Sequence, residues 1–96
     1  MSAREQSKVY TWTEANIRKA PETCGVYTLR TGTPVASIGY VGMVGAGRLR
    51  ARLMEHWTKR DHPKTTHFHW VKCPSEREAA SLERSWREKY EPPWNG

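Results

Sequence analysis

The sequence predicts an α/β domain of the α+β kind, in which a small three-stranded, antiparallel or mixed sheet is flanked by helices in the order αββαβα. Three observations predict this fold. Two β-compatible segments are joined by a turn, an amphipathic helical segment follows them, and the last helix has a clear start signal. The 96 residues suffice for one modest core. We therefore expect a flexible segment at residues 1–10 and a single domain at residues 11–96.

The first elements are a short helix and a hairpin. Thr13 can cap a helix that ends before Pro21, because proline restricts the backbone of the residue that precedes it. Residues 24–30 (Cys-Gly-Val-Tyr-Thr-Leu-Arg) and 35–42 (Val-Ala-Ser-Ile-Gly-Tyr-Val-Gly) are strand-like, and Thr-Gly-Thr-Pro at 31–34 favours a turn between them. A β-hairpin is therefore predicted.

Two helices and one strand are expected in the remainder. Leucines recur at helical spacing in residues 48–57, and residues 67–71 contain β-compatible aromatic and branched side chains. Ser75 and Glu78 form a Ser-x-x-Glu capping box, which marks the start of the last helix. That helix should run to about Tyr90, since two prolines follow it closely.

The composition indicates a partner that carries negative charge. Sixteen Lys and Arg residues against ten Asp and Glu residues give a net charge of +6, although such a balance also serves solubility or binding to an acidic protein. Two cysteines are too few for a disulfide framework, and no apolar run approaches the roughly 20 residues that span a bilayer. We expect no membrane contact and a cytoplasmic location, nucleoid-associated if the protein is bacterial or from a phage.

Two tyrosines in the hairpin are candidate site residues. Gly25 and Tyr27 share one face of the first strand, while Ile38, Tyr40 and Gly42 share one face of the second. If those faces coincide, the two phenols stand side by side. The alternative is that both tyrosines only fill the core.

Helical periodicity places the arginines of the predicted helix at residues 48–57 on different sides of that helix. Arg52 and His56, four residues apart, lie on one flank of its apolar stripe and can reach one ligand. A guanidinium that grips a phosphate beside an imidazole suits phosphodiester chemistry. The alternative is a solvated basic face, which we expect Arg48 and Arg50 to form.

Glu83 lies at the edge of the apolar stripe of the last helix. A carboxylate against a core requires a cation, a metal ion or hydrogen-bond donors, and a salt bridge to an arginine would also serve. His67 and His69 share a strand face and could offer metal nitrogens together with Cys24 or Cys73, but no zinc-type spacing supports this. We expect both histidines at the surface.

Read in order, these residues resemble the GIY-YIG nuclease family. The resemblance rests on Gly25-Val26-Tyr27, Tyr40-Val41-Gly42, Arg52 with His56, Glu83, and Asn95 after Pro93-Trp94. It spans about residues 24–95 and is closest to the N-terminal nuclease domain of the bacterial excision-repair incision subunit. Val26 stands where the family has isoleucine, and the segment 43–48 is longer than in the repair enzyme.

The resemblance implies a metal-dependent endonuclease that hydrolyses DNA by in-line attack of water, leaving 5′-phosphate and 3′-hydroxyl ends. The implied catalytic residues are Tyr27, Tyr40, Arg52, His56, Glu83 and Asn95. By this resemblance Glu83 holds Mg²⁺ or Mn²⁺ and Tyr27 accepts the proton of the water. Asn95 buttresses the site and orients Glu83 or the waters of the metal. A phenol has a pKa of about 10, so this role requires that cationic neighbours and the metal lower the pKa of Tyr27, and Arg52 and His56 could supply the positive field.

The implied partner is nucleic acid, expected to be DNA in a repair setting, and the chain is expected to act as a monomer or a weak homodimer. Arg48, Arg50, Lys59 and Arg60 are the expected nucleic-acid-binding residues. Two alternatives remain at this point. One is a basic module with the same fold that binds nucleic acid without cutting it, and the other is a protein-interaction domain.

Overall fold

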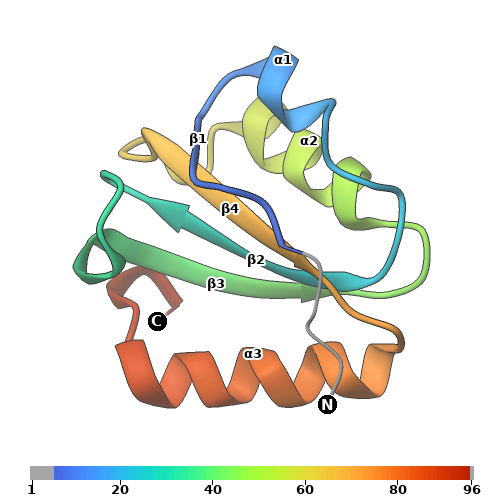
Figure 1. Ribbon diagram of the computed structural model, residues 1–96. Helices are drawn as coiled ribbons and strands as arrows, with labels where there is room; N and C mark the ends of the chain where they lie inside the picture. Colours follow the sequence, from blue (N-terminus) through green and yellow to red (C-terminus); the bar gives the residue numbers. More distant parts are fainter. Residues whose placement is uncertain (1–5, 96) are drawn as a thin grey trace.

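Strands and helices alternate along the chain in the computed structural model, which describes residues 6–95. The elements are β1 (Tyr10–Thr11), α1 (Glu14–Ile17), β2 (Gly25–Arg30), β3 (Ile38–Val44), α2 (Leu49–Lys59), β4 (His67–Lys72) and α3 (Glu76–Tyr90), with short 3₁₀ helices at Val35–Ser37 and Pro93–Asn95. Figure 1 shows that α1 and α2 lie on one side of the sheet and α3 on the other. The α+β class is confirmed.

The sheet has four antiparallel strands in the order β1-β4-β2-β3. The predicted hairpin is β2 with β3, and Tyr27 is opposite Gly42 in its register. All six residues of β2 are buried, because this strand has a neighbour on each edge and helices on both faces. The two edge strands of the described sheet are the short β1 and the longer β3.

The prediction of three strands is wrong, because β1 adds a fourth. Tyr10 pairs with Phe68 of β4, and before β1 the backbone N–H of Ser7 donates to the carbonyl of Trp70 (2.9 Å). Of the segment 1–10 that was predicted to be flexible, residues 6–10 therefore lie along β4, whose backbone groups they satisfy. The remainder of the segment lies outside the described residues. A strand of two residues is too short to show a period-2 pattern.

The two faces of the sheet carry separate cores. The core under α1 and α2 contains Ile17, Ala20, Tyr27, Leu29, Val44, Leu49, Leu53, Phe68 and Trp70. The core under α3 contains Val26, Ile38, Val41, Val71, Cys73 and Ala79. Ile38 was predicted to share a face with Tyr40, but an irregularity in the pairing of β2 with β3 shifts the register there and places Ile38 under α3.

The helix boundaries follow their caps. Thr13 caps α1 by accepting a hydrogen bond from the backbone N–H of Asn16 (3.2 Å), and Ser75 caps α3 by accepting one from the N–H of Glu78 (3.2 Å). Helix α2 ends two residues later than predicted, where Arg60 takes a left-handed backbone conformation, at φ 52°. Among the described residues, each helix is too short or too polar to cross a membrane.

Candidate functional site

Tyr27 and Tyr40 stand side by side on the face of the hairpin that α2 covers. Their ring centroids are 6.0 Å apart, so the two faces coincide as the alternation of the strands predicts. Gly42 lies opposite Tyr27, where an added Cβ would be 2.5 Å from the phenol oxygen. Glycine therefore leaves the room that the ring of Tyr27 occupies.

A chain of hydrogen bonds runs from Tyr27 to the end of α2. The hydroxyl of Tyr27 is 2.7 Å from Nε2 of His56, and Nδ1 of His56 is 2.9 Å from a carboxylate oxygen of Asp61. A carboxylate only accepts hydrogen bonds, so Nδ1 carries the proton and Nε2 of the neutral imidazole accepts from the phenol. Tyr27 and His56 are both buried, whereas Asp61 is exposed.

Burial has the largest effect on the pKa values of Tyr27 and His56. Burial, together with the charge of Tyr40, raises the pKa of Tyr27 far above its ordinary value, although the charge and hydrogen bonding of Arg52 act to lower it. Burial also lowers the pKa of His56, against the opposing effect of Asp61. Arg52 therefore acts on the pKa of Tyr27 in the expected direction, but burial outweighs it, and His56, which burial keeps neutral, adds no positive charge.

The arginines of α2 point in different directions. Arg52 is half-exposed beside Tyr27, and it forms an ion pair with Glu55 (3.2 Å), as does Arg48 (3.3 Å). Arg50 donates to the carbonyl of Ala20 (2.7 Å), so part of its side chain ties α2 to the end of the α1 segment. The other two basic residues predicted to contact nucleic acid, Lys59 and Arg60, are exposed at the end of α2.

Glu83 lies on α3, on the other side of the sheet from α2. It is half-buried and borders a surface hollow with Arg84, Arg87 and Glu88. Helix α3 packs along β3, the edge strand that also carries Tyr40 (Figure 1). The hydrogen bonds and ring contacts of the described residues join Tyr27, Tyr40 and His56, and they do not extend to Glu83.

The side chain of Asn95 makes its hydrogen bonds to the edge strand β3 and not to Glu83. Its Oδ1 accepts from the backbone N–H of Val41 (2.9 Å), and its Nδ2 donates to the carbonyl of the same residue (2.8 Å). The side-chain amide thus pairs with β3 as a further strand would. Trp94 lies over Gly39, where an added Cβ would be 2.5 Å from the indole. The tail after α3 therefore fixes the strand between Tyr40 and Gly42.

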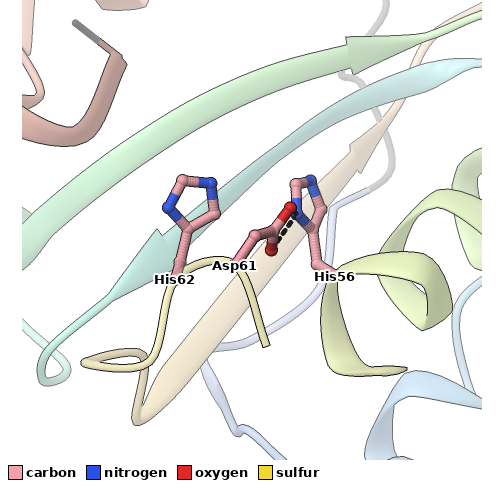
Figure 2. A group of neighbouring side chains, drawn as sticks. All are labelled: His56, Asp61 and His62. Atoms are coloured by element: carbon pink, nitrogen blue, oxygen red, sulfur yellow. Dashed lines mark hydrogen bonds and ion pairs between the residues drawn. The ribbon is translucent and has the colours of Figure 1, made fainter. Parts of the chain in front are cut away.

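Two residues of this cluster were missed in the sequence, Asp61 and His62. Figure 2 shows them directly after α2, with their side chains beside that of His56. The ring of His62 is 4.6 Å from that of Tyr40 and stacks on Trp94 at 5.7 Å. The segment 58–65 looked like a polar connection. A second histidine six residues after His56, next to an aspartate, was the available signal.

Of the residues that the structure describes, His56, Asp61 and His62 form a group that could hold a metal ion. His67 and His69, which the sequence suggested as a possible metal-binding pair, have different surroundings. His69 is buried under α3, where it stacks on Trp86, and was therefore wrongly predicted to lie at the surface. His67 is half-exposed, and its Nδ1 lies 2.9 Å from the hydroxyl of Thr66.

Comparisons with known proteins concern the fold and the family of the chain. The model of a family described as a domain of unknown function, DUF7508, matches residues 6–89. The crystal structure of the GIY-YIG N-terminal endonuclease domain of UvrC from Thermotoga maritima, bound to its catalytic divalent cation, magnesium, is 28% identical, with a TM-score of 0.71, over 85% of this chain and 93% of that one. A tyrosine-to-phenylalanine variant of that domain is 30% identical, with a TM-score of 0.70, over 85% and 92%. The comparison with curated proteins finds no match.

Proposed function

The chain belongs to the DUF7508 family and is a GIY-YIG domain, and from this premise we propose that it is a metal-dependent endonuclease that hydrolyses phosphodiester bonds in DNA. The observation that carries the proposal is the phenol of Tyr27, which meets His56 and Arg52 beside a second tyrosine. The fold is that of an endonuclease domain which binds a catalytic divalent cation. The products have 5′-phosphate and 3′-hydroxyl ends.

Glu83 is the proposed ligand of the divalent cation, Mg²⁺ or Mn²⁺. A half-buried carboxylate fits such an ion, because Mg²⁺ is commonly held by one or two carboxylates, phosphate oxygens and waters. When bound, the cation supplies Lewis acidity and neutralises charge on the scissile phosphate. Arg52, half-exposed at the site, adds positive charge where the transition state gains negative charge.

The hydrogen-bond chain offers a route for the proton of the attacking water. Tyr27 accepts this proton while it donates its own hydroxyl proton to Nε2 of His56, and Asp61 stabilises the imidazolium that forms. No free phenolate has to accumulate, so the raised pKa of Tyr27 is no obstacle. Asp61 acts here through His56 and is a positioning residue.

The exposed cations at the ends of α2 are the proposed contacts to the DNA backbone. Arg48, Lys59 and Arg60 are exposed, whereas Arg50 is half-buried and bonded to Ala20 and Glu22. Such contacts position the duplex without reading its sequence. We propose that the chain acts on DNA as a monomer or a weak homodimer.

A plasmid-nicking assay tests the proposal. The wild type should nick supercoiled DNA in Mg²⁺ and stop when the ion is chelated, and Glu83→Gln should lower the rate by about 100-fold or more. Glu88→Gln is the matched control, since it changes an exposed carboxylate that borders the same hollow. Binding of DNA without any cleavage would instead support the non-catalytic module, and equal rates for Glu83→Gln and the wild type would remove Glu83 from the site.

A further inference from the structure

We propose that His56, Asp61 and His62 form a second metal site, distinct from Glu83, that takes a Zn²⁺-like transition-metal ion. One ligand atom from each side chain lies within 4.8 Å of the other two. The three side chains lie together at the end of α2 (Figure 2). The site is small, close to the tyrosine pair, and on the opposite side of the sheet from α3.

The backbone at the end of α2 brings the ligands together. His56 is in the last turn of the helix, and the left-handed conformation of Arg60 turns the chain so that Asp61 and His62 follow it closely. Nδ1 of His56 is already 2.9 and 3.1 Å from the two oxygens of Asp61. Ligands of tetrahedral Zn²⁺ lie about 3.3 Å apart, given bonds of about 2.0 Å. Only the half-exposed His62 has to approach.

The ligand set favours Zn²⁺ over Mg²⁺. Imidazole nitrogens suit zinc and its neighbours in the transition series, whereas Mg²⁺ prefers oxygen ligands in an octahedron. Two imidazoles and one carboxylate, with a further position open, are a zinc ligand set in proteins. Two of the three ligands line a surface pocket, which is formed by Asp61, His62, Pro63, Lys64 and Trp94.

The surroundings of the site orient its ligands before an ion arrives. Nε2 of His56 is hydrogen-bonded to Tyr27, as the second nitrogen of a metal-binding histidine commonly is to a neighbouring group. When Nδ1 binds the ion, the imidazole proton moves from Nδ1 to Nε2, which then donates to the phenol oxygen. The ring of His62 contacts the rings of Tyr40 and Trp94, so the ion binds a side chain that is already partly ordered.

A bound ion also competes with the proton route. It occupies Nδ1 of His56 and the carboxylate of Asp61, and it leaves Nε2 protonated, so His56 no longer accepts the proton of Tyr27. Zn²⁺ should therefore inhibit cleavage even when Mg²⁺ is in excess. This consequence rests on the proposed function, but the binding of the ion does not.

Calorimetric titration of the full chain with Zn²⁺, in the absence of nucleic acid, tests the site. The wild type should bind one ion with a dissociation constant in the micromolar range or below. His62→Ala should weaken binding by about tenfold or more. His67→Ala is the matched control, because it removes a half-exposed histidine outside the group, and it should bind as the wild type does.

The absorption spectrum of bound Co²⁺ gives a second measurement, since nitrogen and oxygen ligands in a four-coordinate site produce visible bands. The wild type and His67→Ala should show these bands, and His62→Ala and Asp61→Asn, checked for folding by circular dichroism, should lose them. Equal Zn²⁺ affinity for His62→Ala and the wild type would overturn the site, as would the absence of Zn²⁺ binding by the wild type. If Mg²⁺-dependent, Glu83-dependent nicking persists in that case, only the second site fails; if Zn²⁺ binds but nothing is nicked, only the nuclease proposal fails.

Discussion

At the scale of single residues, Tyr27 is a buried phenol whose hydroxyl has a hydrogen-bonding partner. Its side chain is 1% exposed, it packs against the bare backbone of Gly42, and it donates to His56. Burial makes the phenol hard to ionise. The same burial keeps His56 neutral and able to accept a proton, so the two residues work as a pair.

Asp61→Asn tests the positioning role of Asp61. An amide in its place can donate to Nδ1 of His56, which puts the imidazole proton on Nε2 and removes the acceptor for Tyr27. We expect kcat to fall by about 100-fold or more, with KM and DNA affinity nearly unchanged. Steady-state kinetics with Mg²⁺ and a binding titration measure both quantities.

Glu14→Gln is the matched control for that variant, because Glu14 is an exposed carboxylate on α1 that pairs with Arg18 and not with His56 or Arg52. It should keep kcat close to that of the wild type. A loss in Asp61→Asn that appears entirely in KM would contradict the positioning role.

At the scale of elements, the edge strand β3 depends on the tail that follows α3. Asn95 makes two hydrogen bonds to the backbone of Val41, between Tyr40 and Gly42. Among the described residues, no other side chain makes hydrogen bonds to the backbone of this stretch of β3. The position of Tyr40 is therefore coupled to the C-terminal turn.

Asn95→Ala should cost about 1–3 kcal/mol of unfolding free energy, since two hydrogen bonds to the backbone are lost, and it should also lower the cleavage rate. Asn16→Ala is a matched control, because the Asn16 side chain also makes two hydrogen bonds, both donated to Thr11, which is not part of the Tyr27 site. Denaturant unfolding and nicking rates compare the two. Equal loss of activity in both variants would show that Asn95 acts only through general stability.

At the scale of the whole molecule, the core under α3 contains a buried polar group that the proposed chemistry does not use. Nδ1 of His69 faces Thr28 (3.3 Å) and Arg30 (3.5 Å), and its Nε2 lies 2.9 Å from the side-chain oxygen of Gln6. Trp86 of α3 stacks on the ring. Burial, with the charge of Arg30, lowers the pKa of His69 to about 4.

This lowered pKa predicts a loss of stability in acid. The unfolded chain takes up a proton at His69 near its ordinary pKa of about 6.5, whereas the folded chain resists it down to about 4. The contribution is complete above pH 6.5 and is lost as the pH falls toward 4, so it amounts to about 2 kcal/mol between pH 7 and pH 5. Denaturant unfolding at both pH values should show a smaller decrease for His69→Gln, and an equal decrease in both proteins would contradict the assignment.

The sequence predicted the elements whose signals are local. Ser75 marked the start of α3, and the strand alternation placed Tyr27 beside Tyr40. Helical phase also separated Arg52 from Arg50, which bonds away from the tyrosines. These features depend on neighbours within a few residues, so periodicity and capping rules capture them.

Features that depend on distant contacts were not predictable in this way. The strand β1 exists because β4 offers it an edge, and His69 is buried because α3 covers it. Asp61 joins His56 only because the chain reverses after α2. The pKa of Tyr27 follows from total burial, which neighbours in the sequence do not reveal.

The single-turnover cleavage rate of end-labelled DNA by Tyr27→Phe in Mg²⁺ tests whether the Tyr27 site performs hydrolysis. This change keeps the buried ring and removes only the hydroxyl that bonds to His56. Tyr10→Phe is the matched control, in a half-buried tyrosine that packs on Phe68. We expect a rate for Tyr27→Phe at least about 100-fold below that of the wild type. The wild type should leave 5′-phosphate ends, and Tyr10→Phe should cleave normally. A Tyr27→Phe rate equal to that of the wild type would contradict hydrolysis at the Tyr27 site.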